Sequence, residues 1–92
     1  MKVTSVLMTC SASPIQWEGE CEGRPVYVRF RRGRLTVSVG DRGGDIDSAV
    51  DGVRIVETDD FDESHVEWWE VEAILDPIDL EAAIANADGG ES

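Results

Sequence analysis

Residues 15–39 constrain the fold more than any other stretch, because apolar and polar side chains alternate along them with a period of two. Between residues 15 and 22, for example, Ile15, Trp17 and Cys21 alternate with glutamine and glutamate. Such alternation is typical of strands that bury one face and expose the other. Because Gly23–Arg24 and Arg32–Gly33 are suited to tight turns, we predict three antiparallel strands joined as a meander.

The two turns fix the predicted pairing of these strands. A type II′ turn at Gly23–Arg24 places Trp17 opposite Phe30, and a turn at Arg32–Gly33 places Phe30 opposite Leu35. Both registers gather the apolar side chains on one face of the sheet. A shift of one residue would move them to the other face, so the alternation itself supports these pairings.

Further strands are predicted on both sides of the meander. Val3–Cys10 has the composition of a strand, and Met8 is expected opposite Trp17. We expect this strand to be buried on both faces, because apolar residues occupy its odd and its even positions. Val53–Thr58 predicts another strand, which follows a loop rich in glycine and aspartate over residues 40–52, with a short helical turn before Gly52 as an alternative for the end of the loop.

The stretch 65–75 fits two structures. As a helix it can begin at Asp60, with Glu63 as a capping partner. Its apolar residues scatter around a helical wheel, however, whereas they alternate with glutamates if a bulge lies at Trp68–Trp69. On this periodicity we predict a strand.

Residues 76–86 predict a helix, because Asp76 suits the N-cap and Pro77 the first helical position. The chain is therefore predicted to be an α+β protein, with a curled antiparallel sheet of about six strands and one C-terminal helix packed on it. Residues 1–88 are expected to form this single small domain and residues 89–92 a disordered tail. The expected core consists of Trp17, Val28, Phe30, Leu35, Val37, Leu80 and Ile84.

The net charge of −12 at pH 7 is extreme for 92 residues. Carboxylates that solvate the surface explain it more simply than mimicry of a nucleic acid. A single lysine against seven arginines fits adaptation to a salt-rich cytoplasm, although a GC-rich genome would give a similar composition. No apolar run is long enough to span a membrane, and the N-terminal stretch makes a poor signal peptide, so we expect a cytoplasmic protein.

The sequence contains few of the residue types that usually bind metals or act in catalysis. Cys10, Cys21 and His65 are too few for a structural zinc site, and the two cysteines are expected about 20 Å apart at opposite ends of a hairpin. The acidic neighbours of His65 favour its charged form, which is poorly suited to a general base. The aspartates of residues 41–51 lack the calcium-loop pattern. We therefore expect no enzyme activity, no cofactor and no metal.

The basic segment 24–34 is the sharpest feature of the charge pattern. Residues 23–40 carry five arginines and no acid, whereas residues 41–92 carry a net charge of −15. A hypothetical binding surface for an anion or a nucleic-acid strand consists of Tyr27, Arg29, Arg31, Arg32 and Arg34. In the predicted register Arg31 faces Arg34, which favours a nearby anion. We nevertheless prefer the simpler interpretation that neighbouring acids, above all Glu18 and Glu20, neutralise these arginines.

Trp69 is a second candidate for binding. Adjacent tryptophans on a strand point to opposite faces unless a bulge intervenes, so either Trp68 or Trp69 can be exposed and anchor an interface. Packing in the core is the simpler explanation for both.

These observations favour a small acidic, non-enzymatic module for protein interaction or regulation. Its expected partner is another protein or a second copy of the chain, with a homodimer as one form of self-association. The alternative is an accessory nucleic-acid or anion-binding domain that uses the basic hairpin 24–34. The net charge of −12 disfavours nucleic acid as the partner, and no membrane association is expected.

Overall fold

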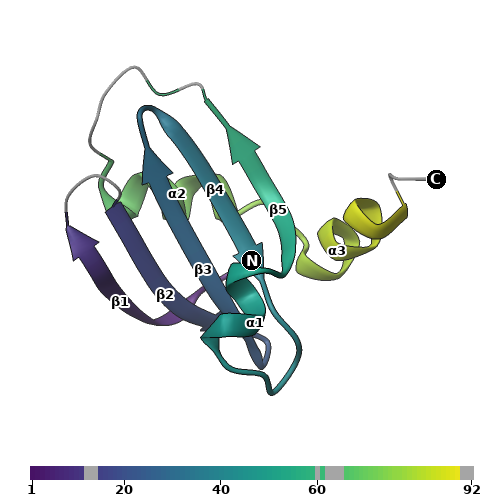
Figure 1. The fold of residues 1–92 in the computed structure, drawn as a ribbon. Helices are drawn as coiled ribbons and strands as arrows, with labels where there is room; N and C mark the ends of the chain where they lie inside the picture. The colour runs from purple at the N-terminus through teal and green to yellow at the C-terminus, as the bar shows by residue number, and fades with distance from the viewer. Residues whose placement is uncertain (12–14, 60, 62–65, 90–92) are drawn as a thin grey trace.

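The computed structural model describes residues 1–11, 15–59, 61 and 66–89. Within them, five strands form one antiparallel sheet in the order β1-β2-β3-β4-β5 (Figure 1). The strands are β1 (Thr4–Ser11), β2 (Ile15–Cys21), β3 (Arg24–Arg31), β4 (Arg34–Val39) and β5 (Val53–Thr58). The helices are α1 (Ile46–Val50), α2 (Trp68–Leu75) and α3 (Leu80–Gly89). The predicted α+β class with an antiparallel meander is confirmed, but the described residues form five strands instead of about six and three helices instead of one.

Two tight turns hold the central meander together. Glu22 and Gly23 have φ of 52° and 79°, and Arg32 and Gly33 have φ of 53° and 78°. Positive φ at both central residues defines type I′ turns, whose twist matches that of the flanking strands. The predicted register of β3 with β4 is confirmed by the pairing of Phe30 with Leu35.

The predicted register of β2 with β3 is wrong by two residues. Trp17 lies opposite Val28, because the turn occupies Glu22–Gly23 and Arg24 already belongs to β3. A shift of two residues keeps every side chain on its predicted face, which is why the apolar face is still correct. It does change the polar neighbours: Gln16, and not Glu18, lies opposite Arg29.

Strand β1 forms one edge of the sheet. The predicted pairing of Met8 with Trp17 is confirmed, but the register shifts on both sides of it. Burial on both faces is contradicted, because the Leu7 side chain is 64% exposed and the Met8 side chain 46% exposed. No strand lies beyond β1 among the described residues, so its outer backbone edge is not paired with another strand.

The strand predicted over residues 65–75 is wrong, because Trp68–Leu75 is a helix. Its N-cap is Glu67, whose N–H donates to the Glu70 carboxylate at 2.8 Å, as in a capping box. Trp68, Val71 and Leu75 follow helical spacing and face the core. The helical wheel misled because it included Val66, which is fully buried but precedes the helix. The alternative helix start, Asp60 with Glu63, lies outside the described residues, as does His65.

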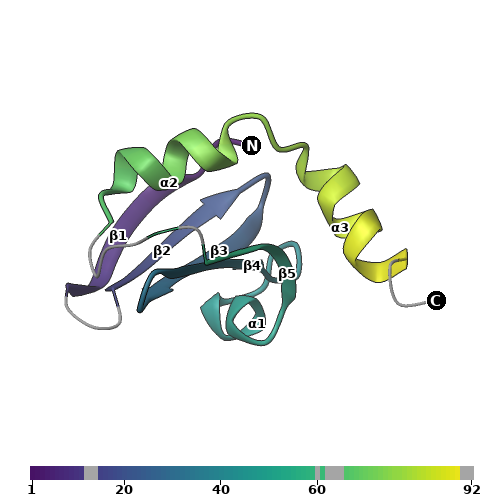
Figure 2. The same ribbon diagram turned by 90° about the horizontal axis from the view of Figure 1, so that it is seen from above.

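Helix α2 and the sheet enclose the core. Viewed along the sheet, α2 lies over one face, which we call the inner face, and α1 lies against the opposite, outer face (Figure 2). The rings of Trp17 and Trp68 are 5.6 Å apart between centroids, and Phe30 meets Phe61 edge to face at 5.3 Å. The predicted core is confirmed: six of its seven residues are buried, and Ile84 is partly buried against them.

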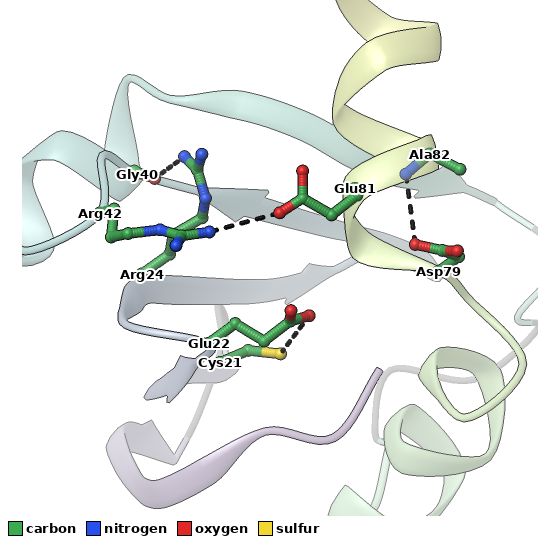
Figure 3. Close-up of polar contacts among 8 residues, drawn as sticks. All are labelled: Cys21, Glu22, Arg24, Gly40, Arg42, Asp79, Glu81 and Ala82. Carbon is green, nitrogen blue, oxygen red and sulfur yellow. Dashed lines mark hydrogen bonds and ion pairs between the residues drawn. The ribbon is translucent and has the colours of Figure 1, made fainter.

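Helix α3 lies beside β5 and not over the sheet (Figures 1 and 2). Asp79, and not Asp76, receives an N-terminal N–H of this helix, from Ala82 at 3.3 Å, whereas Asp76 ends α2 (Figure 3). Arg42 of the loop before α1 reaches Glu81 of α3 at 3.3 Å. Residues 12–14, between β1 and β2, and residues 90–92 of the predicted tail lie outside the described residues.

Candidate functional site

Among the described residues, only one end of the outer face of the sheet is covered. Helix α1 packs on β3 and β4 near the end where Gly40 donates its N–H to the Pro25 carbonyl at 2.9 Å. At the other end, beside the β3–β4 turn, an open groove of about 520 Å³ remains. We call it the arginine groove; its lining consists of Arg29, Arg31, Arg32, Arg34, Thr36, Arg54, Glu57 and Asp59.

The strand pairing explains how four arginines from the basic hairpin meet here. Arg29 and Arg31 are two residues apart on β3, so both point to the outer face. Arg34 lies directly opposite Arg31, and Arg32 occupies the turn between them. The structure therefore brings together all four arginines that the sequence singles out. Arg24 lies at the opposite end of β3, where its guanidinium donates to the Gly40 carbonyl at 3.0 Å (Figure 3).

Arg54 of β5 completes the groove and was not predicted. In a regular strand Arg54 and Glu57 would point to opposite faces. The register of β5 against β4 shifts between Val37 and Ser38, so that Thr36 pairs with Glu57 and Ser38 with Arg54. This irregularity turns Arg54 and Glu57 to the same outer face.

Glu57 is a carboxylate that pairs with arginines of the groove. Its Oε2 atom accepts from Arg34 Nη2 at 2.7 Å and from Arg54 Nη1 at 2.6 Å. These two hydrogen bonds lower the pKa of Glu57, and the same contact raises the pKa of Arg34. Glu57 therefore stays ionised at neutral pH, and its carboxylate pairs with two of the guanidinium groups.

The remaining charge of the groove is positive. Five arginines against the two carboxylates of Glu57 and Asp59 leave an excess of three positive charges in a protein of net charge −12. The Nε atom of Arg29 is buried and has no hydrogen-bond partner. Glu18 and Glu20, which were expected to neutralise these arginines, do not lie opposite them. Glu18 pairs with Tyr27 and Glu20 with Pro25.

Tyr27 and Trp69 do not line the groove. Tyr27 shares the outer face but lies two residues further along β3, where it is half-buried. Trp69 belongs to α2 on the other side of the sheet and is 69% exposed. The set of binding residues suggested by the sequence therefore divides into a groove on one face and a tryptophan on the other.

The cysteines are placed at opposite ends of the β1–β2 hairpin, with Cys10 opposite Gln16 and Cys21 next to the β2–β3 turn. Burial raises the pKa of the Cys21 thiol, and the nearby Glu22 carboxylate adds to this, so the reactive thiolate is disfavoured. In the part of the chain that the structure describes, no group of three or more His, Cys, Asp and Glu side chains is arranged to hold a metal ion.

Comparisons with known proteins add no relative: no family model, no curated protein and no solved structure matches the chain. Among the described helices, none combines the length and apolar character needed to cross a membrane. The basis for a functional proposal is therefore the chemistry of the groove itself.

Proposed function

We propose that the chain is a small non-enzymatic protein-interaction module, and that its arginine groove recognises an acidic segment of a partner protein. The observation that carries this proposal is the convergence of five arginines on one open groove in a strongly acidic protein. Guanidinium groups bind carboxylates through paired, charge-assisted hydrogen bonds. Arg31 and Arg34 face each other as like charges, and a bound carboxylate between them would relieve their repulsion.

An acidic protein segment fits the charge distribution better than a nucleic acid does. A nucleic-acid strand extends its phosphates beyond the groove, where the net charge of −12 repels them. A short segment with a few carboxylates places its charges within the groove. A nucleic-acid or other polyanion site is the second candidate, and it is favoured by Tyr27, whose ring lies on the same face as the arginines.

The proposed setting is a salt-rich, reducing cytoplasm. Direct contacts such as those of 2.6 and 2.7 Å between Glu57 and its arginines are no longer than the Debye length of about 3 Å at 1 M salt. Binding inside the groove should therefore weaken less with added salt than the long-range repulsion between acidic proteins does. This setting suits a module that meets an acidic partner.

Replacing Arg31 with glutamate should weaken binding of an oligoglutamate peptide by about tenfold or more, because one charge-assisted contact is lost and a repulsive charge is added. Arg31 is exposed, so the fold should be retained. The measurement is fluorescence anisotropy of a labelled peptide at two salt concentrations. Arg42→Glu is the matched control, since it changes the net charge equally but lies on the loop that reaches α3.

Equal loss in the Arg31 and Arg42 variants would contradict a specific groove, because it would reduce the effect to net charge. A labelled single-stranded oligonucleotide is titrated in parallel. Tighter binding of the oligonucleotide than of the peptide, with loss in the Arg31 variant, would replace the first proposal with the second candidate.

Glu57→Gln should strengthen binding of the same peptide by roughly two- to fivefold, in keeping with the modest free energy of exposed ion pairs. The substitution releases Arg34 and Arg54 from their shared carboxylate. Because the pKa of Glu57 is lowered, Glu57 stays ionised across neutral pH, so the gain should be constant there. Unchanged affinity would show that Glu57 does not compete with the ligand.

A further inference from the structure

Helix α2 carries a second unpartnered surface, of opposite character to the groove. Trp69, Glu72, Ala73 and Asp76 follow the spacing of a single helical face and line one shallow hollow together with Met1 and Lys2. We call these four helical residues the α2 outer face, which is distinct from the outer face of the sheet. Trp69 is 69% exposed, although large aromatic side chains are usually covered. The face thus combines a tryptophan ring with two carboxylates.

This combination complements an arginine cluster. Guanidinium groups stack on tryptophan rings and at the same time form hydrogen bonds with carboxylates. The groove has an excess of three positive charges, whereas α2 and its two capping residues contain four acids and no base. Two positive groups, Lys2 and the N-terminal ammonium of Met1, also lie beside the α2 outer face, so the helix with its caps and these two groups keeps a net charge of −2. The two surfaces are therefore complementary. The guanidinium groups of the groove can stack on the Trp69 ring and pair with the carboxylates of Glu72 and Asp76.

We propose that the arginine groove of one copy binds the α2 outer face of a second copy, so that the protein assembles head to tail. This inference rests on the proposed function, because it names the acidic partner of the same groove. Trp69 supplies the aromatic anchor at the centre of the contact, and Glu72 and Asp76 pair with the arginines around it.

The position of the two surfaces determines the kind of assembly. The groove lies on the outer face of the sheet and α2 lies over the inner face, so the two surfaces are on opposite sides of the sheet (Figure 2). When two copies join through two different surfaces, one copy keeps a free groove and the other keeps a free α2 outer face. Assembly therefore continues past the dimer, as a ring or an open chain.

The experiment is sedimentation velocity over a range of protein concentrations, at low and at high salt. The wild-type mass should rise beyond that of a dimer with concentration. Three variants are compared: Arg31→Glu/Arg34→Glu in the groove, Glu72→Lys/Asp76→Lys on the helix, and Glu20→Lys/Glu22→Lys as a control that changes the net charge as the helix variant does. All six residues are exposed, so the variants should fold.

The groove variant and the helix variant should each associate about tenfold more weakly than wild type, while the control associates normally. An equimolar mixture of the groove and helix variants should associate again, because their charges are exchanged and complementary. Trp69→Ala should weaken association without a change in net charge.

Wild-type protein that is monomeric throughout, or that stops at a dimer, would overturn head-to-tail assembly. So would a helix variant that associates like wild type. Peptide binding separates this failure from failure of the proposed function: if oligoglutamate binds the wild type and the helix variant alike but not the groove variant, the groove keeps its function and only the second copy is excluded as its partner.

Discussion

Trp17→Ala should lower the free energy of unfolding by about 3–5 kcal/mol, as is typical of a large aromatic side chain removed from a core. Trp17 is 3% exposed, and its ring packs against that of Trp68 in α2. The substitution leaves a cavity between the sheet and the helix and removes the contact that fastens α2 to β2. Because small domains are stable by only about 5–15 kcal/mol, much of the variant should be unfolded at moderate urea concentrations.

Urea denaturation followed by circular dichroism measures this effect. Trp69→Ala is the matched control, since the same substitution on the exposed side of α2 should change stability by no more than about 0.5 kcal/mol. Similar losses for the two tryptophans would contradict the assignment of one to the core and the other to the surface.

Gly40→Ala should destabilise the protein by about 2 kcal/mol, because the new methyl group would overpack the junction between β4 and α1. A Cβ atom at position 40 would lie 2.6 Å from the backbone nitrogen of Ala49 and 2.7 Å from the carbonyl carbon of Ser48. These are main-chain atoms of α1, so the clash is relieved only if the helix moves off the sheet. Amide hydrogen exchange should show the loss of protection concentrated in α1 and the end of β4.

Two further variants define this effect. Gly43→Ala meets no atom within 4 Å, so its cost of roughly 1–2 kcal/mol should come from the positive φ alone and leave α1 protected. Ser48→Ala in the Gly40→Ala background removes the clashing hydroxyl but leaves the main-chain contacts and loses the hydroxyl's hydrogen bonds with Asp41 and Asp45, so it should restore only a small part of the stability. Full protection of α1 in Gly40→Ala would contradict the close approach of the helix.

The central meander was predictable because each of its strands repeats a strict alternation. That alternation fixes which face a side chain occupies but is unchanged by a shift of two residues. The β3–β4 register was correct because Arg32–Gly33 fits the observed turn. The β2–β3 register was not, because Gly23 can serve in either central position of a tight turn, and the structure uses it in the second.

Helix α2 was missed for a different reason. It is only eight residues long, and its N-cap is a glutamate, which is not among the residues that usually begin helices. Its position is set by tertiary packing, in which Trp68 meets Trp17 and Val71 and Leu75 enter the core. Such contacts lie outside any local sequence window.

The candidate site was predictable in the part that is local in sequence. Arg29, Arg31 and Arg34 meet because they belong to one hairpin, and the alternation alone places them on one face. Arg54 and Glu57 come from β5, and they share that face only because the strand is irregular between them. No pattern of residue types in Val53–Thr58 signals that irregularity, so the fifth arginine and its carboxylate could not be predicted.

The irregular edge strand β1 has a consequence for the protein at high concentration. A long, flat, uncovered edge is a template on which strands of other molecules add by backbone hydrogen bonds. In β1 the register shifts twice, and Ser5 has φ of 55°, which breaks the run of evenly spaced donors and acceptors. Strand addition is therefore blocked where Leu7 and Met8 are exposed, and aggregation by growth of the sheet is disfavoured. Association is left to side-chain contacts, which salt and competing ligands can reverse.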